Sequence, residues 1–192
     1  MDEAETVAGM RWKALFDDLE AQAEAAAAAE LEGEVRDRTR RELGLLGVRD
    51  RLRPAQGYEL SVAVHGAGTV TGRLLDTGPD WVLLDERAGR ELLVPLSAVL
   101  SVGGLGRRAE QRGRDEVGRR LDLRWALRGL ARDRAPVQVL LRDGSSLAGT
   151  LDRVGADYVD LAEHPQGEAR RPAAVQGVRL VPLSALALVR QG

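Results

Sequence analysis

An internal repeat is the feature that most constrains the fold of this chain. Residues 137–161 have the pattern of three short strands joined by tight turns, and residues 60–84 match them 77 positions earlier. In both copies apolar residues alternate with others, which is the period of a strand that buries one face. The matched positions are Leu60, Val62 and Val64 with Val137, Val139 and Leu141, then Gly72 with Gly149, Gly78 with Gly155, Asp80 with Asp157, Trp81 with Tyr158, and Leu84 with Leu161. We therefore expect two copies of one small β unit.

Both copies contain turn-forming residues and end with the same five-residue sequence, called the closing phrase below. Asp143-Gly144 supplies the positive φ that a two-residue hairpin turn needs. Gly149, in the middle of the second strand, predicts a sharp bend like those of small closed barrels. Each copy then closes with Val-Pro-Leu-Ser-Ala, at residues 94–98 and 181–185. These phrases are 87 positions apart, so the second copy has ten more residues between its third and fourth strands.

A helix is expected before each copy. From residue 10 to about residue 41, apolar side chains recur every three or four positions, the stripe of an amphipathic helix. We expect this long N-terminal helix either to self-associate, with Trp12, Phe16 and Leu19 at the contact, or to pack on its own barrel. A second helix is expected at residues 115–131, with arginines on the face opposite Trp125.

Composition excludes several kinds of site. The 192 residues include no cysteine, which rules out disulfides and thiolate metal ligands. No apolar run approaches the roughly 20 residues of a membrane-spanning helix, and the acidic N-terminus is unlike a signal peptide, so a cytoplasmic location is expected. The net charge of −2 argues against a dedicated nucleic-acid-binding protein, although residues 103–134 carry ten arginines and five acidic residues.

The second copy resembles the first motif of the Sm-like (LSm-type) small-barrel superfamily. The match runs Val137-x-Val139-x-Leu141-x-Asp143-Gly144-x-x-Leu147-x-Gly149-x-Leu151. The first copy keeps Gly72 but has Gly66-Ala67 in place of Asp-Gly. The resemblance implies a mainly β fold with helices (α+β), made of two tandem Sm-like five-stranded small barrels, each preceded by a helix. The start at residues 11–20 followed by two barrels also resembles a family of actinobacterial proteins of uncharacterised function.

The chain departs from RNA-binding Sm proteins at the base pocket. Those proteins hold a base with an asparagine after the third-strand turn and an Arg-Gly pair between the fourth and fifth strands. Here Val159-Asp160 and Pro182-Leu183 stand at these places in the second copy, and Val82-Leu83 and Pro95-Leu96 in the first. The uridine pocket is therefore not carried over. Two barrels in one chain could still pair through their own edge strands, as one interface of an Sm ring does, with helices covering the outer edges.

Arginines are the candidate contacts for a nucleic acid or another partner, because a guanidinium binds phosphate as a bidentate donor. Acidic residues are interleaved with them, so they also fit a solvated helix face or a dock for the acidic N-terminal helix, and the sequence favours this second interpretation. The residues are Arg107, Arg108, Arg112, Arg114, Arg119, Arg120, Arg170 and Arg171.

The sequence shows no catalytic, cofactor-binding or metal-binding set. His164 lies in the insertion at residues 162–178 with carboxylates nearby, and we interpret it as a surface-loop histidine. Asp80 and Asp157 each precede an aromatic residue and are expected to bond to the amides of their own turns. Those aromatic residues, Trp81 and Tyr158, are expected to pack in the core or at the mouth of each barrel.

Together these patterns predict an N-terminal helical region at 1–56, a first barrel at 57–102, an arginine-rich linker and helix at 103–134, and a second barrel at 135–192. We expect a non-enzymatic binding or scaffold protein, without cofactor or small-molecule substrate, that forms a homo-oligomer and binds a protein partner. The alternative is an RNA- or DNA-associated regulatory protein that uses arginines outside the usual Sm base pocket.

Overall fold

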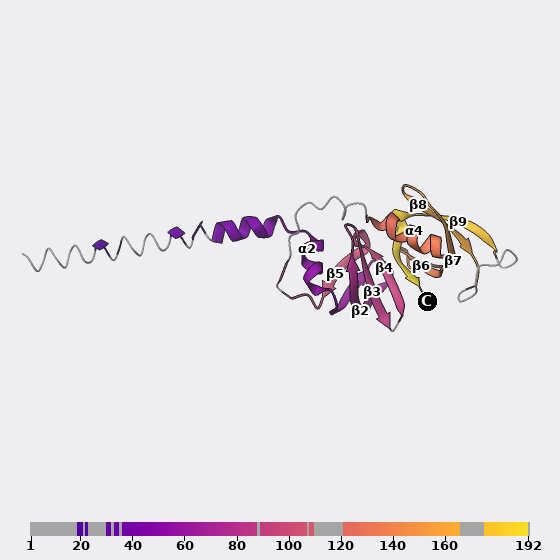
Figure 1. Ribbon diagram of the computed structural model, residues 1–192, viewed down its shortest axis with the longest axis horizontal. Helices are drawn as coiled ribbons and strands as arrows, with labels where there is room; N and C mark the ends of the chain where they lie inside the picture. Colours follow the sequence, from indigo (N-terminus) through magenta and orange to yellow (C-terminus); the bar gives the residue numbers. More distant parts are fainter. Residues whose placement is uncertain are drawn as a thin grey trace, which may run out of the picture. The chain divides into compact units, whose positions relative to one another are not determined.

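The computed structural model describes residues 19, 20, 22, 30, 31, 33, 34, 36–87, 89–106, 108, 109, 121–165 and 175–191. The chain divides into two compact units, Met1–Leu46 and Gly47–Gly192. Helical backbone is continuous at residues 36–44 of the first unit. The second unit contains all ten strands described (Figure 1).

Both repeats build a helix followed by five strands, with a 3-10 turn between the fourth and fifth strands; the first repeat has one further 3-10 turn after its helix. The first consists of α2 (Val48–Leu52), η1 (Arg53–Ala55), β1 (Glu59–Val64), β2 (Gly68–Thr77), β3 (Trp81–Arg87), β4 (Arg90–Pro95), η2 (Leu96–Ala98) and β5 (Val99–Gly103). The second consists of α4 (Leu123–Asp133), β6 (Pro136–Leu141), β7 (Ser146–Val154), β8 (Tyr158–Glu163), β9 (Gly177–Pro182), η4 (Leu183–Ala185) and β10 (Leu186–Gln191). The predicted repeat is therefore confirmed: the closing phrase ends the fourth strand of each copy and forms its 3-10 turn.

The prediction of two closed five-stranded barrels is wrong. All ten strands form one open antiparallel sheet in the order β5-β1-β2-β3-β4-β10-β6-β7-β8-β9. Within each repeat the fifth strand pairs with the first and does not meet the fourth, so neither set closes. The edge of β4 pairs instead with β10, through Leu93 opposite Val189 and Leu92 opposite Arg190. The anticipated pairing of the two repeats through their own edge strands is thus present.

Among the described residues the expected long N-terminal helix is also not found. The described helices are short, and continuous helix before α2 is limited there to residues 36–44. Most of residues 10–35 lies outside the described part of the chain. Of the second helix expected at residues 115–131, residues 115–120 lie outside the described part of the chain. The described helix α4 begins at Leu123, where the carboxylate of Asp122 accepts the backbone N–H of Trp125 and caps it.

Two apolar cores meet at the β4–β10 junction. Trp81 and Leu93 belong to the first repeat but pack into the core of the second, against Leu127 of α4 and Val189 of β10. In the opposite direction, Leu188 of β10 packs into the core of the first repeat. Because each repeat supplies side chains to the other's core, we expect the two to unfold together.

The matched glycines admit close neighbours. A Cβ on Gly72 would lie 2.7 Å from the carbonyl oxygen of Asp85, and one on Gly149 would overlap the carbonyl oxygen of Ala162. The register shifts in β2 and β7 come two residues or more beyond these glycines, between Leu74 and Asp76 and between Leu151 and Arg153. These glycines therefore allow the third strand of each repeat to approach, and the irregularity follows them.

Candidate functional site

The start of α4 is held by two adjacent residues of the first repeat. The Trp81 indole N–H donates to the carbonyl oxygen of Leu121 at 2.8 Å. The neighbouring Asp80 carboxylate accepts the backbone N–H of Leu123, also at 2.8 Å. Asp80 was expected to bond to the amides of its own turn; its carboxylate accepts its own backbone amide and also an amide 43 residues along the chain. The bonds to Leu121 and Leu123 place α4 above the β4–β10 junction.

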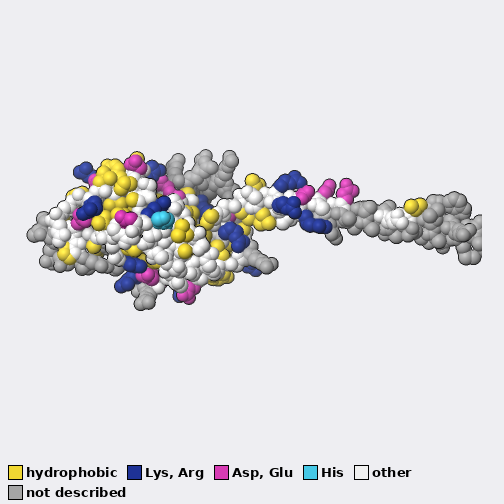
Figure 2. Space-filling model, turned by 180° about the vertical axis from the view of Figure 1, so that it is seen from behind, with side chains coloured by type: hydrophobic (Ala, Val, Ile, Leu, Met, Phe, Trp, Pro, Cys, Tyr) yellow, Lys and Arg dark blue, Asp and Glu magenta, His cyan; other side chains and the backbone are white. Residues whose placement is uncertain are grey.

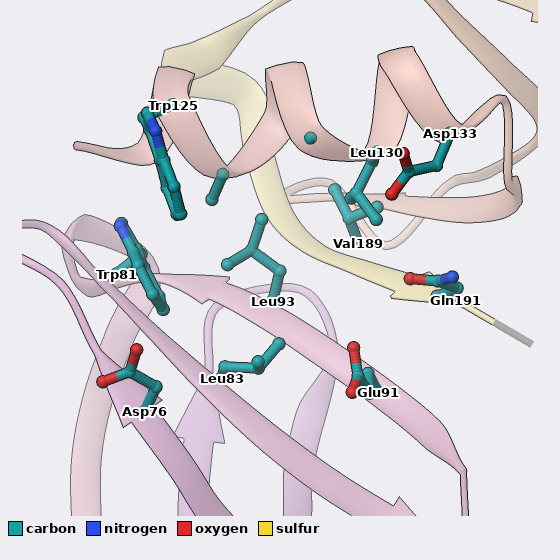
Figure 3. A pocket seen from close by; sticks show the side chains of 12 residues that line it. Asp76, Trp81, Leu83, Glu91, Leu93, Trp125, Leu130, Asp133, Val189 and Gln191 are labelled. Carbon is teal, nitrogen blue, oxygen red and sulfur yellow. The ribbon is translucent and has the colours of Figure 1, made fainter. Parts of the chain in front are cut away.

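A pocket lies between α4 and this junction (Figure 3). It has a volume of about 330 Å³ and draws its lining from five elements: β2, β3, β4, α4 and β10. Leu83, Leu93, Leu130 and Val189 supply its apolar middle. The remaining lining residues are Asp76, Trp81, Glu91, Trp125, Ala126, Gly129, Asp133 and Gln191.

The polar groups of the pocket stand at its two ends. In Figure 3, Trp81 and Trp125 lie at one end with Asp76 beside Trp81, while Glu91 and Asp133 lie at the other. Trp125 is 52% exposed, although it was expected on an apolar helix face. The lining contains three carboxylates and neither lysine nor arginine, so its own formal charge is negative; one of the three, Asp133, is paired with the exposed Arg132 beside the pocket at 3.6 Å.

Two carboxyl groups beside α4 have shifted pKa values. Burial raises the pKa of Asp80 above its usual value, the nearby Asp122 adds to the rise, and the hydrogen bond from Leu123 opposes it. Burial also acts to raise the pKa of Asp122, but the hydrogen bonds from the Trp125 amide and the Arg124 guanidinium outweigh it, so the net shift is downward. Asp122 is therefore the carboxylate that keeps its charge more readily, as suits a helix N-cap.

The outer edges of the sheet form a second candidate surface. β5 pairs only with β1 and β9 only with β8 among the described strands, so each offers an unpaired row of backbone groups. Leu100 of β5 is 66% exposed, and Val178 and Leu180 of β9 are 63% and 57% exposed. Hydrophobic side chains are visible on the surface of the sheet unit between charged ones (Figure 2).

Most of the predicted contact residues cannot be placed. Arg107, Arg112, Arg114, Arg119, Arg120, Arg170 and Arg171, like Trp12 and Phe16, lie outside the described residues. Arg108 is exposed, and its carbonyl oxygen accepts from the Arg51 guanidinium at 3.0 Å. Leu19 is half-exposed. Of the eight candidate arginines, Arg108 alone lies among the described residues.

His164 does not lie in an exposed loop. It is only 3% exposed, and its Nε2 lies 2.8 Å from the hydroxyl of Thr150, which is also buried. Its Nδ1 lies 3.0 Å from the carbonyl oxygen of Pro165. This histidine is thus a hydrogen-bonded core residue, and among the residues that the structure describes no group of His, Asp or Glu is arranged to hold a metal ion.

Sequence reasoning missed the pocket because its residues come from distant parts of the chain. Trp125 was the one available signal, a large aromatic residue on the expected apolar face of the second helix.

Within the described ranges no helix has the length and apolar character needed to cross a membrane. No protein-family model matches the chain, and no curated protein matches it in sequence.

Proposed function

We propose that the protein is a non-enzymatic scaffold that assembles with further copies of itself in the cytoplasm, β9 of one copy pairing with β5 of the next. The observation that carries the proposal is the β4–β10 pairing between the two repeats. β9 is the repeat equivalent of β4, and β5 is the equivalent of β10. One such pair is joined within the chain, and the other pair is left as two open edges.

Burial at equivalent positions supports this assignment. Leu93 of β4 is 4% exposed because β10 and α4 cover it, whereas the equivalent Leu180 of β9 is 57% exposed. Ala187 of β10 is fully buried, whereas the equivalent Leu100 of β5 is 66% exposed. Each outer edge thus presents an apolar side chain where the inner junction buries one. Pairing between copies would cover both and satisfy the edge hydrogen bonds.

The two edges differ from each other, so the contact is head-to-tail. A head-to-tail contact repeats until it closes into a ring or extends as a filament. A small tandem protein of this kind presents many identical surfaces in one assembly, which is how a scaffold gathers a protein partner. The Sm-like resemblance agrees with this proposal, since pairing through edge strands resembles one interface of an Sm ring.

The test measures mass in solution over a dilution series, by light scattering after size-exclusion chromatography. We expect the wild type to form species larger than a monomer that dissociate on dilution, and Leu180→Asp to remain monomeric. Leu45→Asp is the matched control, because Leu45 is also exposed but lies outside the sheet. A wild type that is monomeric throughout, or a Leu180→Asp variant that assembles like the wild type, would contradict the proposal.

A further inference from the structure

The pocket beneath α4 combines features that select a ligand of particular chemistry. Its middle is aliphatic, lined by Leu83, Leu93 and Val189, and its volume of about 330 Å³ falls within the range of small-molecule sites. Carboxylates stand at both ends, Asp76 at one and Glu91 with Asp133 at the other (Figure 3). An apolar middle between two acidic ends fits an aliphatic chain with a positive charge at each end.

The two tryptophans strengthen the preference for a cation at their end of the pocket. Trp81 is buried with its N–H already bonded to Leu121, so its ring is held in place. Trp125 is half-exposed above it on α4. An ammonium group over the face of an indole is attracted by the ring's electron distribution, and Asp76 adds a charge at the same end.

The acidic residues that line the pocket have no acidic equivalents at the matching positions of the other repeat. The second-repeat equivalent of Glu91 is Val178, and that of Asp76 is Arg153. Asp133 lies at the end of α4, where the first repeat has Gln56. The three carboxylates therefore belong to the β4–β10 junction and do not recur at the equivalent positions of the other repeat.

We propose that this pocket binds an aliphatic diamine or polyamine, with one ammonium at the end that holds Trp81, Trp125 and Asp76 and another at the end that holds Glu91 and Asp133. The ligand's methylene chain lies along the leucines and Val189. Binding requires no partner chain, because every lining residue belongs to one copy. The site is independent of the scaffold assembly proposed above.

The test uses isothermal titration calorimetry of the whole protein with 1,5-diaminopentane. Its comparison ligands are 1-aminopentane, which has one charge, and pentane-1,5-diol, which has none. We expect saturable binding in the order diamine, monoamine, diol, and weakening by salt because the ion pairs are solvent-exposed. Saturation by the diamine is expected below about 10 mM. Equal binding of diamine and diol, or no saturable binding of the diamine, would overturn the proposal.

Variants locate the binding. Glu91→Gln and Asp133→Asn should each weaken diamine binding about two- to fivefold, the range for an exposed ion pair. Trp125→Leu should weaken it by a similar factor while keeping an apolar side chain on α4. Asp157→Asn, at an exposed carboxylate outside the pocket, should leave it unchanged. Since Glu91, Asp133 and Trp125 are not fully buried, these variants should fold. Equal binding by all of them would place the diamine elsewhere and refute the site.

Discussion

Asp80 and Trp81 show how single residues tie distant segments of this protein together. Both lie at the start of β3, and both bond to backbone groups at the beginning of α4, about forty positions later. These two bonds join the helix of the second repeat to the third strand of the first repeat.

The raised pKa of Asp80 predicts a pH dependence. A carboxyl group whose pKa is higher in the folded protein than in the unfolded chain binds protons more readily when folded, so stability falls as pH rises through the window just above 3.8. Asp80→Asn removes this titration and retains an oxygen that can accept from Leu123.

The free energy of unfolding in urea, measured for both proteins from about pH 3.5 to about pH 7, checks this. We expect the Asn variant to gain stability relative to the wild type as pH rises through that window. Above that window, the difference in free energy of unfolding between the two proteins should stay constant. A difference that is constant with pH, or that moves in the opposite direction, would show that Asp80 is not held in an environment that favours its protonated form.

At the scale of elements, glycines allow close packing against the third strand of each repeat. Gly78 and Gly155 lie directly beneath the rings of Trp81 and Tyr158, where any side chain would collide with the ring. This explains why a glycine and an aromatic residue recur together in both copies. Gly149 lies equally close to the backbone of β8, which cannot move without disturbing the sheet.

Gly149→Ala should therefore destabilise the protein by about 1–3 kcal/mol, the usual cost of forcing a group into packed space. Gly177→Ala is the matched control, because an added Cβ there meets nothing within 4 Å. Its effect should stay within about 0.5 kcal/mol. Chemical denaturation measures the free energy of unfolding of both variants. Equal losses of stability would show that the space between Gly149 and Ala162 is not too small for a Cβ atom.

Strands β4 and β9 provide a second matched comparison. Leu93→Ala should cost about 2–5 kcal/mol, because it removes a buried side chain from the junction of the repeats. Leu180→Ala, at the equivalent and exposed position, should change the stability of the monomer by less than about 0.5 kcal/mol. Thermal or urea unfolding at a concentration where the protein is monomeric tests this. Similar losses of stability in the two variants would mean that the Leu180 side chain on β9 is buried like Leu93.

At the scale of the whole molecule, the sequence predicted the strands better than their pairing. The alternation of apolar with other residues and the closing phrase located both repeats, because these signals are local in sequence. Whether the fourth strand meets its own fifth strand or that of the other repeat depends on contacts between residues such as Leu93 and Val189, nearly a hundred positions apart. Local patterns carry no such information, so closed barrels were expected and an open ten-stranded sheet is found.

The same reason explains the errors at single sites. His164 has polar neighbours in sequence, which favoured a surface loop, but Thr150 on the adjacent strand provides it with a buried partner. The pocket is assembled from five elements, so its acidic residues are scattered along the chain. The arginine-rich segment was prominent because its arginines lie close together in the sequence.

The most direct test of the account mixes two variants, each with one outer edge blocked. Leu100→Asp places a charge on β5, and Leu180→Asp places one on β9, both at exposed positions that should not affect folding of the monomer. Sedimentation velocity gives the species present for each variant alone and for an equimolar mixture. If β9 of one copy pairs with β5 of the next, each variant alone is monomeric and the mixture forms a dimer that grows no further. Assembly of either variant alone, or a mixture that stays monomeric, would contradict head-to-tail pairing through these two strands.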